Sequence, residues 1–88
     1  MTDDAEQVWL VEREYSDKGL VTLVYATPDG ERAMRSNRSI NMLTRQGVTA
    51  ATEADPGKLT AIEDDDLRER YAREAQRMQS KHDPDDEV

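Results

Sequence analysis

The run "LVTLVYATPDGERAM" constrains the fold of this chain more than any other feature. Residues 20–27 are rich in aliphatic, β-branched and aromatic residues, which favour a strand. The "PDG" at 28–30 is typical of a tight turn, because proline presets one turn position and glycine accepts a left-handed one. Residues 31–36 then return as a second strand, poor in apolar residues and typical of a sheet edge. The pattern predicts a β-hairpin in which Thr27 faces Glu31.

Two further elements set the fold class. "QVWLVEREY" before the hairpin is a third strand, and its four successive apolar residues indicate cover on both faces. Residues 64–81 place an apolar stripe at helical spacing, after Asp64 or Asp65 as the cap. The members of this stripe are Leu67, Tyr71, Ala75 and Met78. The sequence therefore predicts an α+β fold: a three-stranded antiparallel meander packed against a C-terminal amphipathic helix.

The middle of the chain is less regular. Residues 37–47 predict a short helix that begins at Asn37 or Ser39 and ends at Gly47. Its core-facing residues are Ile40 and Leu43. Residues 48–62 fit a short strand, a helical continuation or an irregular segment anchored by Leu59 and Ile62. The predicted organisation is a disordered tail over 1–5, a single domain over 6–81 and an acidic mobile tail over 82–88.

Charge and hydropathy indicate the environment. The net charge is −8, and nine of the twelve basic residues are arginine. Phenylalanine is absent, and leucine, isoleucine and valine together number fourteen. Little apolar area is then available to offset conformational entropy, whereas concentrated salt screens repulsion between carboxylates. We therefore expect a protein of a high-salt cytoplasm, with an acidic mesophilic protein as the alternative.

Several segments carry a family resemblance. "VWLVEREY", "LVYATPDGER", "RERYAREAQRM" and "HDPDDEV" resemble a group of short acidic, uncharacterised proteins of halophilic archaea. The likeness covers most of the chain. It implies a high-salt cytoplasm and carries no activity or site residues to this sequence.

Residues 32–52 form a basic island in the acidic chain. They hold four arginines and no acid, whereas the flanking segments 1–31 and 53–88 each carry a net charge of −6. The four residues are Arg32, Arg35, Arg38 and Arg45. They predict either a site for anions or pairing with this protein's own acids, within the chain or between subunits. We expect pairing, because phosphate contacts weaken steeply with salt and the island has no aromatic residue for base stacking.

A protein interface is the other candidate site. Both faces of the first two strands carry apolar residues, but the long helix covers only one of them. The candidate interface residues are Trp9, Val11, Leu20 and Val24. They predict a homo-oligomer, with a dimer as the simplest form, or a protein partner, although a tryptophan in a strand is more often part of the core.

Chemistry has little support in the sequence. There is no cysteine, His82 precedes the acidic "DPDDEV", and the "EDDD" at 63–66 is better explained as a helix start. We expect no catalytic, cofactor or metal residues. No apolar run is long enough to cross a bilayer, and the acidic N-terminal residues do not resemble a signal peptide.

The leading hypothesis is a protein-interaction or assembly module. Nucleic-acid regulation through the arginines is the runner-up, although we expect nucleic acid to be an improbable partner. A small enzyme with an intersubunit site comes third.

Overall fold

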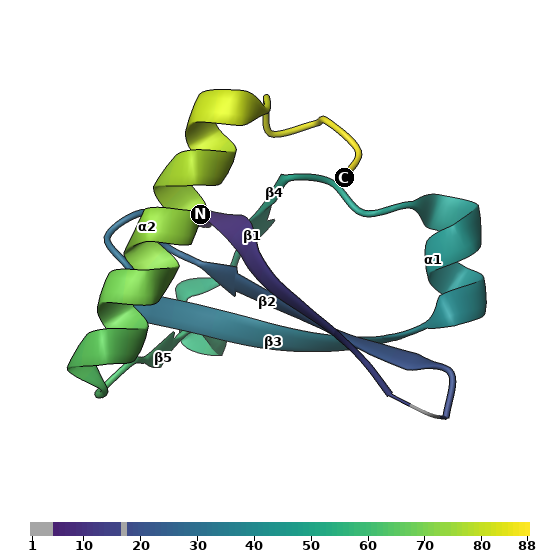
Figure 1. The fold of residues 1–88 in the computed structure, drawn as a ribbon, viewed down its shortest axis with the longest axis horizontal. Coiled ribbons are helices and arrows are strands. Elements are labelled where there is room, and N and C mark those ends of the chain that lie inside the picture. The colour runs from purple at the N-terminus through teal and green to yellow at the C-terminus, as the bar shows by residue number, and fades with distance from the viewer. Residues whose placement is uncertain (1–4, 17) are drawn as a thin grey trace.

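The computed structural model describes residues 5–16 and 18–88. Most of the disordered tail predicted over 1–5 therefore lies outside the described residues. Within these two described ranges, five strands and two α-helices follow one another, with one short 3₁₀ turn (Figure 1). Their order is β1 (Glu6–Tyr15), β2 (Leu20–Ala26), β3 (Arg32–Ser39), α1 (Ile40–Gln46), β4 (Ala51–Ala54), η1 (Pro56–Lys58), β5 (Thr60–Ala61) and α2 (Asp65–Lys81).

The strands form one antiparallel sheet in the order β4-β1-β2-β3-β5. The α+β class and the β1–β2–β3 meander are confirmed, but a sheet of three strands is wrong. Both extra strands come from residues 48–62, where β4 pairs with the start of β1 and β5 pairs with the start of β3. They are four and two residues long and carry mostly alanine and threonine, so their hydrophobic signal is weak.

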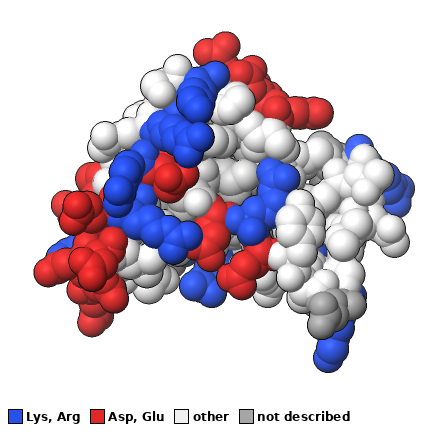
Figure 2. Space-filling view, in the orientation of Figure 1, with Lys and Arg blue, Asp and Glu red and all other residues white. Residues whose placement is uncertain are grey.

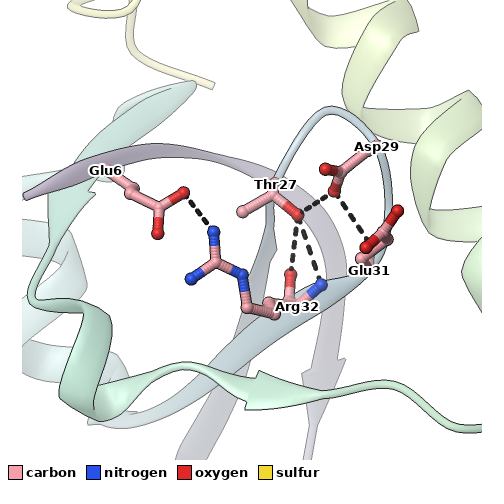
Figure 3. Close-up of polar contacts among 5 residues, drawn as sticks. All are labelled: Glu6, Thr27, Asp29, Glu31 and Arg32. Carbon is pink, nitrogen blue, oxygen red and sulfur yellow. Dashed lines mark hydrogen bonds and ion pairs between the residues drawn. The ribbon is translucent and has the colours of Figure 1, made fainter.

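The β2–β3 turn is one residue longer than the sequence predicts. Thr27 pairs with Arg32, not Glu31, because Thr27 N–H donates to Arg32 O at 3.0 Å. Asp29 fixes this longer turn: its Oδ1 accepts from Thr27 Oγ1 at 2.5 Å and from Glu31 N–H at 2.9 Å (Figure 3). The side-chain bonds of an Asx-type turn therefore set the register of the whole hairpin.

Helix α2 covers one face of the sheet (Figure 1). The apolar stripe predicted for α2 is confirmed. Tyr71 and Ala75 are buried, and Leu67 and Met78 are partly buried against the core clusters. Asp64 is the N-cap and accepts from Leu67 N–H at 3.1 Å, which satisfies one free donor of the first turn. The residues of the sheet beneath α2 are Trp9, Val11, Val24, Ala26, Ala33 and Ala51.

The second face of the sheet is covered by α1 and the segment that follows it. Val8, Leu10, Val21, Leu23 and Tyr25 form the buried cluster on this face. From α1 to β5, the residues outside the meander that join this cluster or pack against it are Leu43, Val48, Ala54 and Leu59. The chain therefore covers most of both apolar faces with its own segments.

Helix α1 lies beyond the end of β3. Ser39 is its N-cap and accepts from Met42 N–H at 3.1 Å, and Gly47 ends it with φ +75°. Leu43 reaches the core as predicted, but Ile40 is 41% exposed. The core-facing role predicted for Ile40 is wrong because α1 extends away from the sheet, so that only one side of it meets the cluster.

The last seven residues fold back onto the segment before β4. Val88 N–H donates to Val48 O and Ala50 N–H donates to Asp86 O, both at 2.8 Å. Val88 also packs against two of the buried clusters. This ordered packing differs from the mobile tail that the sequence predicts for residues 82–88, because the single valine after the acidic run supplies an apolar anchor.

Candidate functional site

The outer edge of β3 is the first feature of the candidate site. Backbone bonds at both ends of β3 show which residues face β2: Thr27 N–H donates to Arg32 O at 3.0 Å, and Ile40 N–H donates to Gly19 O at 2.9 Å. Antiparallel partners alternate between bonded and non-bonded pairs, and the β2–β3 register is unbroken. The even-numbered residues of β3 therefore bond to β2, and the odd-numbered residues present N–H and C=O outward.

Strand β5 pairs with only the first part of this edge. It pairs with Arg32 and Ala33, and in the described part of the chain no strand pairs with Arg35 or Asn37 from outside. The corresponding edge of β1 is different, because a β-bulge lies between Leu10 and Glu12, just beyond the β4 pairing. A bulge disrupts the row of groups that a further strand needs. The β3 edge is therefore the better template for strand addition.

A cavity of about 710 Å³ lies on one side of this edge. Its apolar floor belongs to the second face of the sheet, and α1 and residues 47–58 form its walls. The lining residues that matter below are Tyr25, Met34, Arg35, Arg38, Glu53 and Lys58. This volume is within the range of sites that bind small ligands or side chains.

A second cavity of about 420 Å³ lies on the other side of the same edge. Its apolar lining comes from β2, β3, the residue after β5 and the start of α2, namely Val24, Ala33, Ile62, Leu67 and Tyr71. Met34, Arg35 and Lys58 line both cavities. The free edge of β3 is therefore flanked on each face by a hollow that can take a side chain.

The four arginines of the basic island take different positions. Arg32 forms an ion pair with Glu6 across the sheet (Figure 3), whereas Arg38 Nε donates to Ser36 Oγ at 2.9 Å. Among the described residues, no carboxylate lies within 4.0 Å of Arg35, Arg38 or Arg45. Pairing within the chain therefore explains Arg32 alone. Arg45 is exposed on α1 and lies outside the lining of both cavities.

The charge around the site differs from that of the whole chain. In Figure 2 acidic side chains gather at the first turn of α2 and along the segment after this helix. The larger cavity is lined by three cations, Arg35, Arg38 and Lys58, against two carboxylates, Glu53 and Asp55. A local excess of positive charge in a chain of net charge −8 favours an acidic partner.

Among the described residues, three groups have shifted pKa values with clear physical causes. Burial raises the pKa of Tyr25 on the cavity floor, opposed by the guanidinium groups of Arg38 and Arg13. Burial also raises the pKa of Tyr71. The hydrogen bond from the Thr27 hydroxyl lowers the pKa of Asp29, helped by the N–H of Glu31. Both phenols therefore stay neutral and can donate hydrogen bonds at neutral pH.

The residues predicted as an interface lie mainly inside the chain. Trp9 and Val24 are each 3% exposed, and Val11 packs with them beneath α2. Of the four, only Leu20 lies at the surface, at 46% exposure. An interface through Trp9, Val11 and Val24 does not agree with this burial, because α2 covers the face that these residues share.

The exposed large apolar side chains gather at one end of the molecule. Tyr15 and Leu20 lie near the tip of the β1–β2 hairpin, and Ile40 and Met42 lie on the adjacent α1. Gly19 O bonds Ile40 N–H and so holds the two elements together. This apolar end adjoins the free part of β3, as expected of an interaction surface.

The remaining candidates carry no site. His82 Nδ1 lies 3.7 Å from Asp86 Oδ2, and within the described ranges no group of three or more histidine, cysteine or acidic residues is placed to hold a metal. None of the described helices is long and apolar enough to cross a membrane. The carboxyl with a shifted pKa, Asp29, lies in the β2–β3 turn outside both cavities.

Sequence reasoning found part of this site. It identified β3 as an edge strand and singled out Arg35 and Arg38, but it missed Tyr25, Lys58 and the cavities. Lys58 reaches the cavity only because η1 and β5 fold back against β3. The "DPGK" turn at 55–58 was the only available signal for that return.

Comparison with protein families gives a match over the whole chain. The matching model is described as a family of unknown function, DUF7967, and covers residues 1–88. No curated protein and no solved structure matches the chain.

Proposed function

Because the chain belongs to DUF7967, a family of unknown function, we propose its role from the site: it is a small protein-interaction module. It binds an extended segment of a partner protein, which adds as a strand to the free edge of β3. The observation that carries the proposal is that the backbone N–H and C=O groups of Arg35 and Asn37 face outward, between two cavities. Main-chain bonds supply affinity in such complexes, and pockets for alternate side chains supply specificity.

Nucleic-acid binding through the arginines has weaker support. Arg32 is paired with Glu6. Arg35 and Arg38 line the larger cavity, but Arg45 does not. Tyr25, the aromatic residue of this lining, is only 7% exposed and offers no platform for base stacking. The high negative charge of the chain also repels phosphate.

We also propose that the module works in concentrated salt. The support is its composition: net charge −8 with fourteen leucine, isoleucine and valine residues. Strand addition suits that environment, because backbone hydrogen bonds and apolar burial depend less on salt than exposed charge pairs do.

The test uses peptides selected against the protein from a displayed random library. Asn37→Pro removes an outward N–H and should block strand addition, because proline cannot donate to a ladder. The backbone of residue 37 makes no hydrogen bond to β2, so the Asn37→Pro variant should fold. Asn37→Ala is the matched control, since it equally removes the side-chain bond from Thr22 Oγ1 at 2.9 Å but keeps the N–H.

We expect selected peptides to bind the wild type and Asn37→Ala and to lose binding to Asn37→Pro. Folding of each variant is checked by circular dichroism. Equal binding to a folded Asn37→Pro variant, or failure of the library to yield any binder, would contradict strand addition.

A further inference from the structure

We propose that the partner segment is acidic at one position and apolar at the next. The acidic side chain enters the larger cavity beside Arg38 and Lys58, and the apolar side chain enters the smaller cavity beside Ile62 and Tyr71. This inference rests on the proposed function, because it assigns the chemistry of the strand that adds to β3.

The alternation of a strand connects the two cavities. Successive side chains of a strand point to opposite faces of the sheet. A strand beside Arg35 and Asn37 would therefore direct its side chains in turn to the face of the larger cavity and to the face of the smaller one. The segment thus presents two kinds of side chain to two different chemical environments.

The larger cavity suits a carboxylate. Arg38 is held by Ser36 Oγ at 2.9 Å, a neutral acceptor that leaves the terminal nitrogens of its guanidinium for a ligand. Two carboxylates, Glu53 and Asp55, line the same cavity, and Asp55 Oδ1 accepts Gly57 N–H at 3.0 Å. The three cations Arg35, Arg38 and Lys58 still outnumber them. The Tyr25 phenol on the cavity floor supplies a further donor, since burial holds its pKa above the usual range.

The smaller cavity suits an apolar side chain. Val24 and Tyr71 are 3% and 2% exposed, and Ile62 and Leu67 pack against the same buried cluster. Arg35 and Lys58 lie at the boundary shared with the larger cavity. An aliphatic side chain entering there would remove from water the apolar surface of Val24, Ile62 and Leu67.

Two other occupants fit this edge less well. A second copy paired through the same edge would bring Arg35 and Arg38 against their own counterparts, and like charges facing each other destabilise an interface. The chain's own acidic segment at 82–88 is bonded to Val48 and Ala50 just before β4, and β1 and β2 separate β4 from the β3 edge. A short acidic segment of another protein meets neither obstacle.

The experiment compares three eight-residue peptides that alternate glutamate and valine, glutamine and valine, or lysine and valine. Binding is measured by fluorescence anisotropy with the full chain, over a potassium chloride series. We expect the glutamate peptide to bind about tenfold more tightly than the glutamine peptide, and the lysine peptide to bind weakest. The ratio should fall with salt yet persist, because partly buried pairs are screened less.

Variants assign the effect to the cavity. Arg38→Gln with Lys58→Gln should remove the preference for glutamate, and Arg38→Glu should shift binding toward the lysine peptide. Arg45→Gln is the matched control, because Arg45 lies outside both cavities, and it should keep the wild-type preference.

The outcomes separate the two proposals. Binding lost in Asn37→Pro but equal for glutamate and glutamine peptides would overturn the acidic specificity and leave strand addition standing. Glutamate binding that persists in Asn37→Pro would overturn strand addition and this inference together. Concentration-dependent self-association through the β3 edge, lost in Asn37→Pro, would assign the edge to a second copy instead.

Discussion

Gly30→Ala tests how the β2–β3 turn is packed. Gly30 has φ +72°, and a Cβ placed there would lie 2.1 Å from Arg68 O and 2.7 Å from Ala72 N, both backbone atoms of α2. The positive φ costs an alanine about 1–2 kcal/mol, and forcing α2 away adds about 1–3 kcal/mol. We therefore expect Gly30→Ala to lower the free energy of unfolding by about 2–5 kcal/mol.

Gly19→Ala is the matched control for this substitution. Gly19 also has a positive φ, +76°, but nothing lies within 4 Å of the Cβ that an alanine would add. It should therefore lose only the conformational part, about 1–2 kcal/mol. Both substitutions reduce the conformational entropy of the unfolded chain equally. The difference between their free energies of unfolding therefore isolates the contact between the turn and α2.

The assay is urea denaturation followed by circular dichroism and by Trp9 fluorescence, in molar potassium chloride. An 88-residue domain has a total stability of about 4–13 kcal/mol, so the effect at Gly30 is a large fraction of it. Equal losses in Gly30→Ala and Gly19→Ala, at unchanged denaturant slope, would refute the close approach of the turn to α2.

Three other predictions concern folding. Circular dichroism across a potassium chloride series should show structure gained toward molar salt, because salt screens a net charge of −8; full folding with an unchanged melting temperature at low salt would contradict this. Removal of residues 83–88 should lower the melting temperature, because Val88 packs against the core and Asp86 O accepts Ala50 N–H; an unchanged melting temperature would indicate a mobile tail. Because the pKa of Asp29 is lowered in the folded state, its carboxylate contributes stability that is complete above the unfolded value of 3.8 and is lost as the pH falls from there through the folded value. Asp29→Ala should therefore lose less stability than the wild type over that pH interval; an acid-unfolding profile identical to that of the wild type would contradict this.

Elements with strong local signals were predictable from the sequence. The apolar stripe of α2, its Asp64 cap and the Ser39 and Gly47 ends of α1 each follow from a few neighbouring residues. The turn register was not predictable from "PDG" alone, because it depends on hydrogen bonds that the Thr27 hydroxyl and the Glu31 N–H donate to the Asp29 carboxylate.

Elements that depend on distant partners were missed. Strands β4 and β5 are short and exist because β1 and β3 offer edges to them. The candidate site has the same origin, since Lys58 meets Arg38 only across the cavity that these late segments enclose. Val8 and Leu10 illustrate the opposite error: an apolar run indicated an unpartnered face, but residues 43–59 cover the face of Val8 and Leu10 within the chain.

Hydrogen exchange at the backbone amides of β3 tests the central claim most directly. In the free protein, the N–H groups of Arg35 and Asn37 should exchange fast, whereas those of Ser36 and Arg38, which bond to β2, should exchange slowly. A selected peptide should slow Arg35 and Asn37 specifically. Arg35 and Asn37 amides already as protected as Ser36 and Arg38 in the free protein, or unchanged at a saturating concentration of peptide, would contradict a free edge that accepts a partner strand.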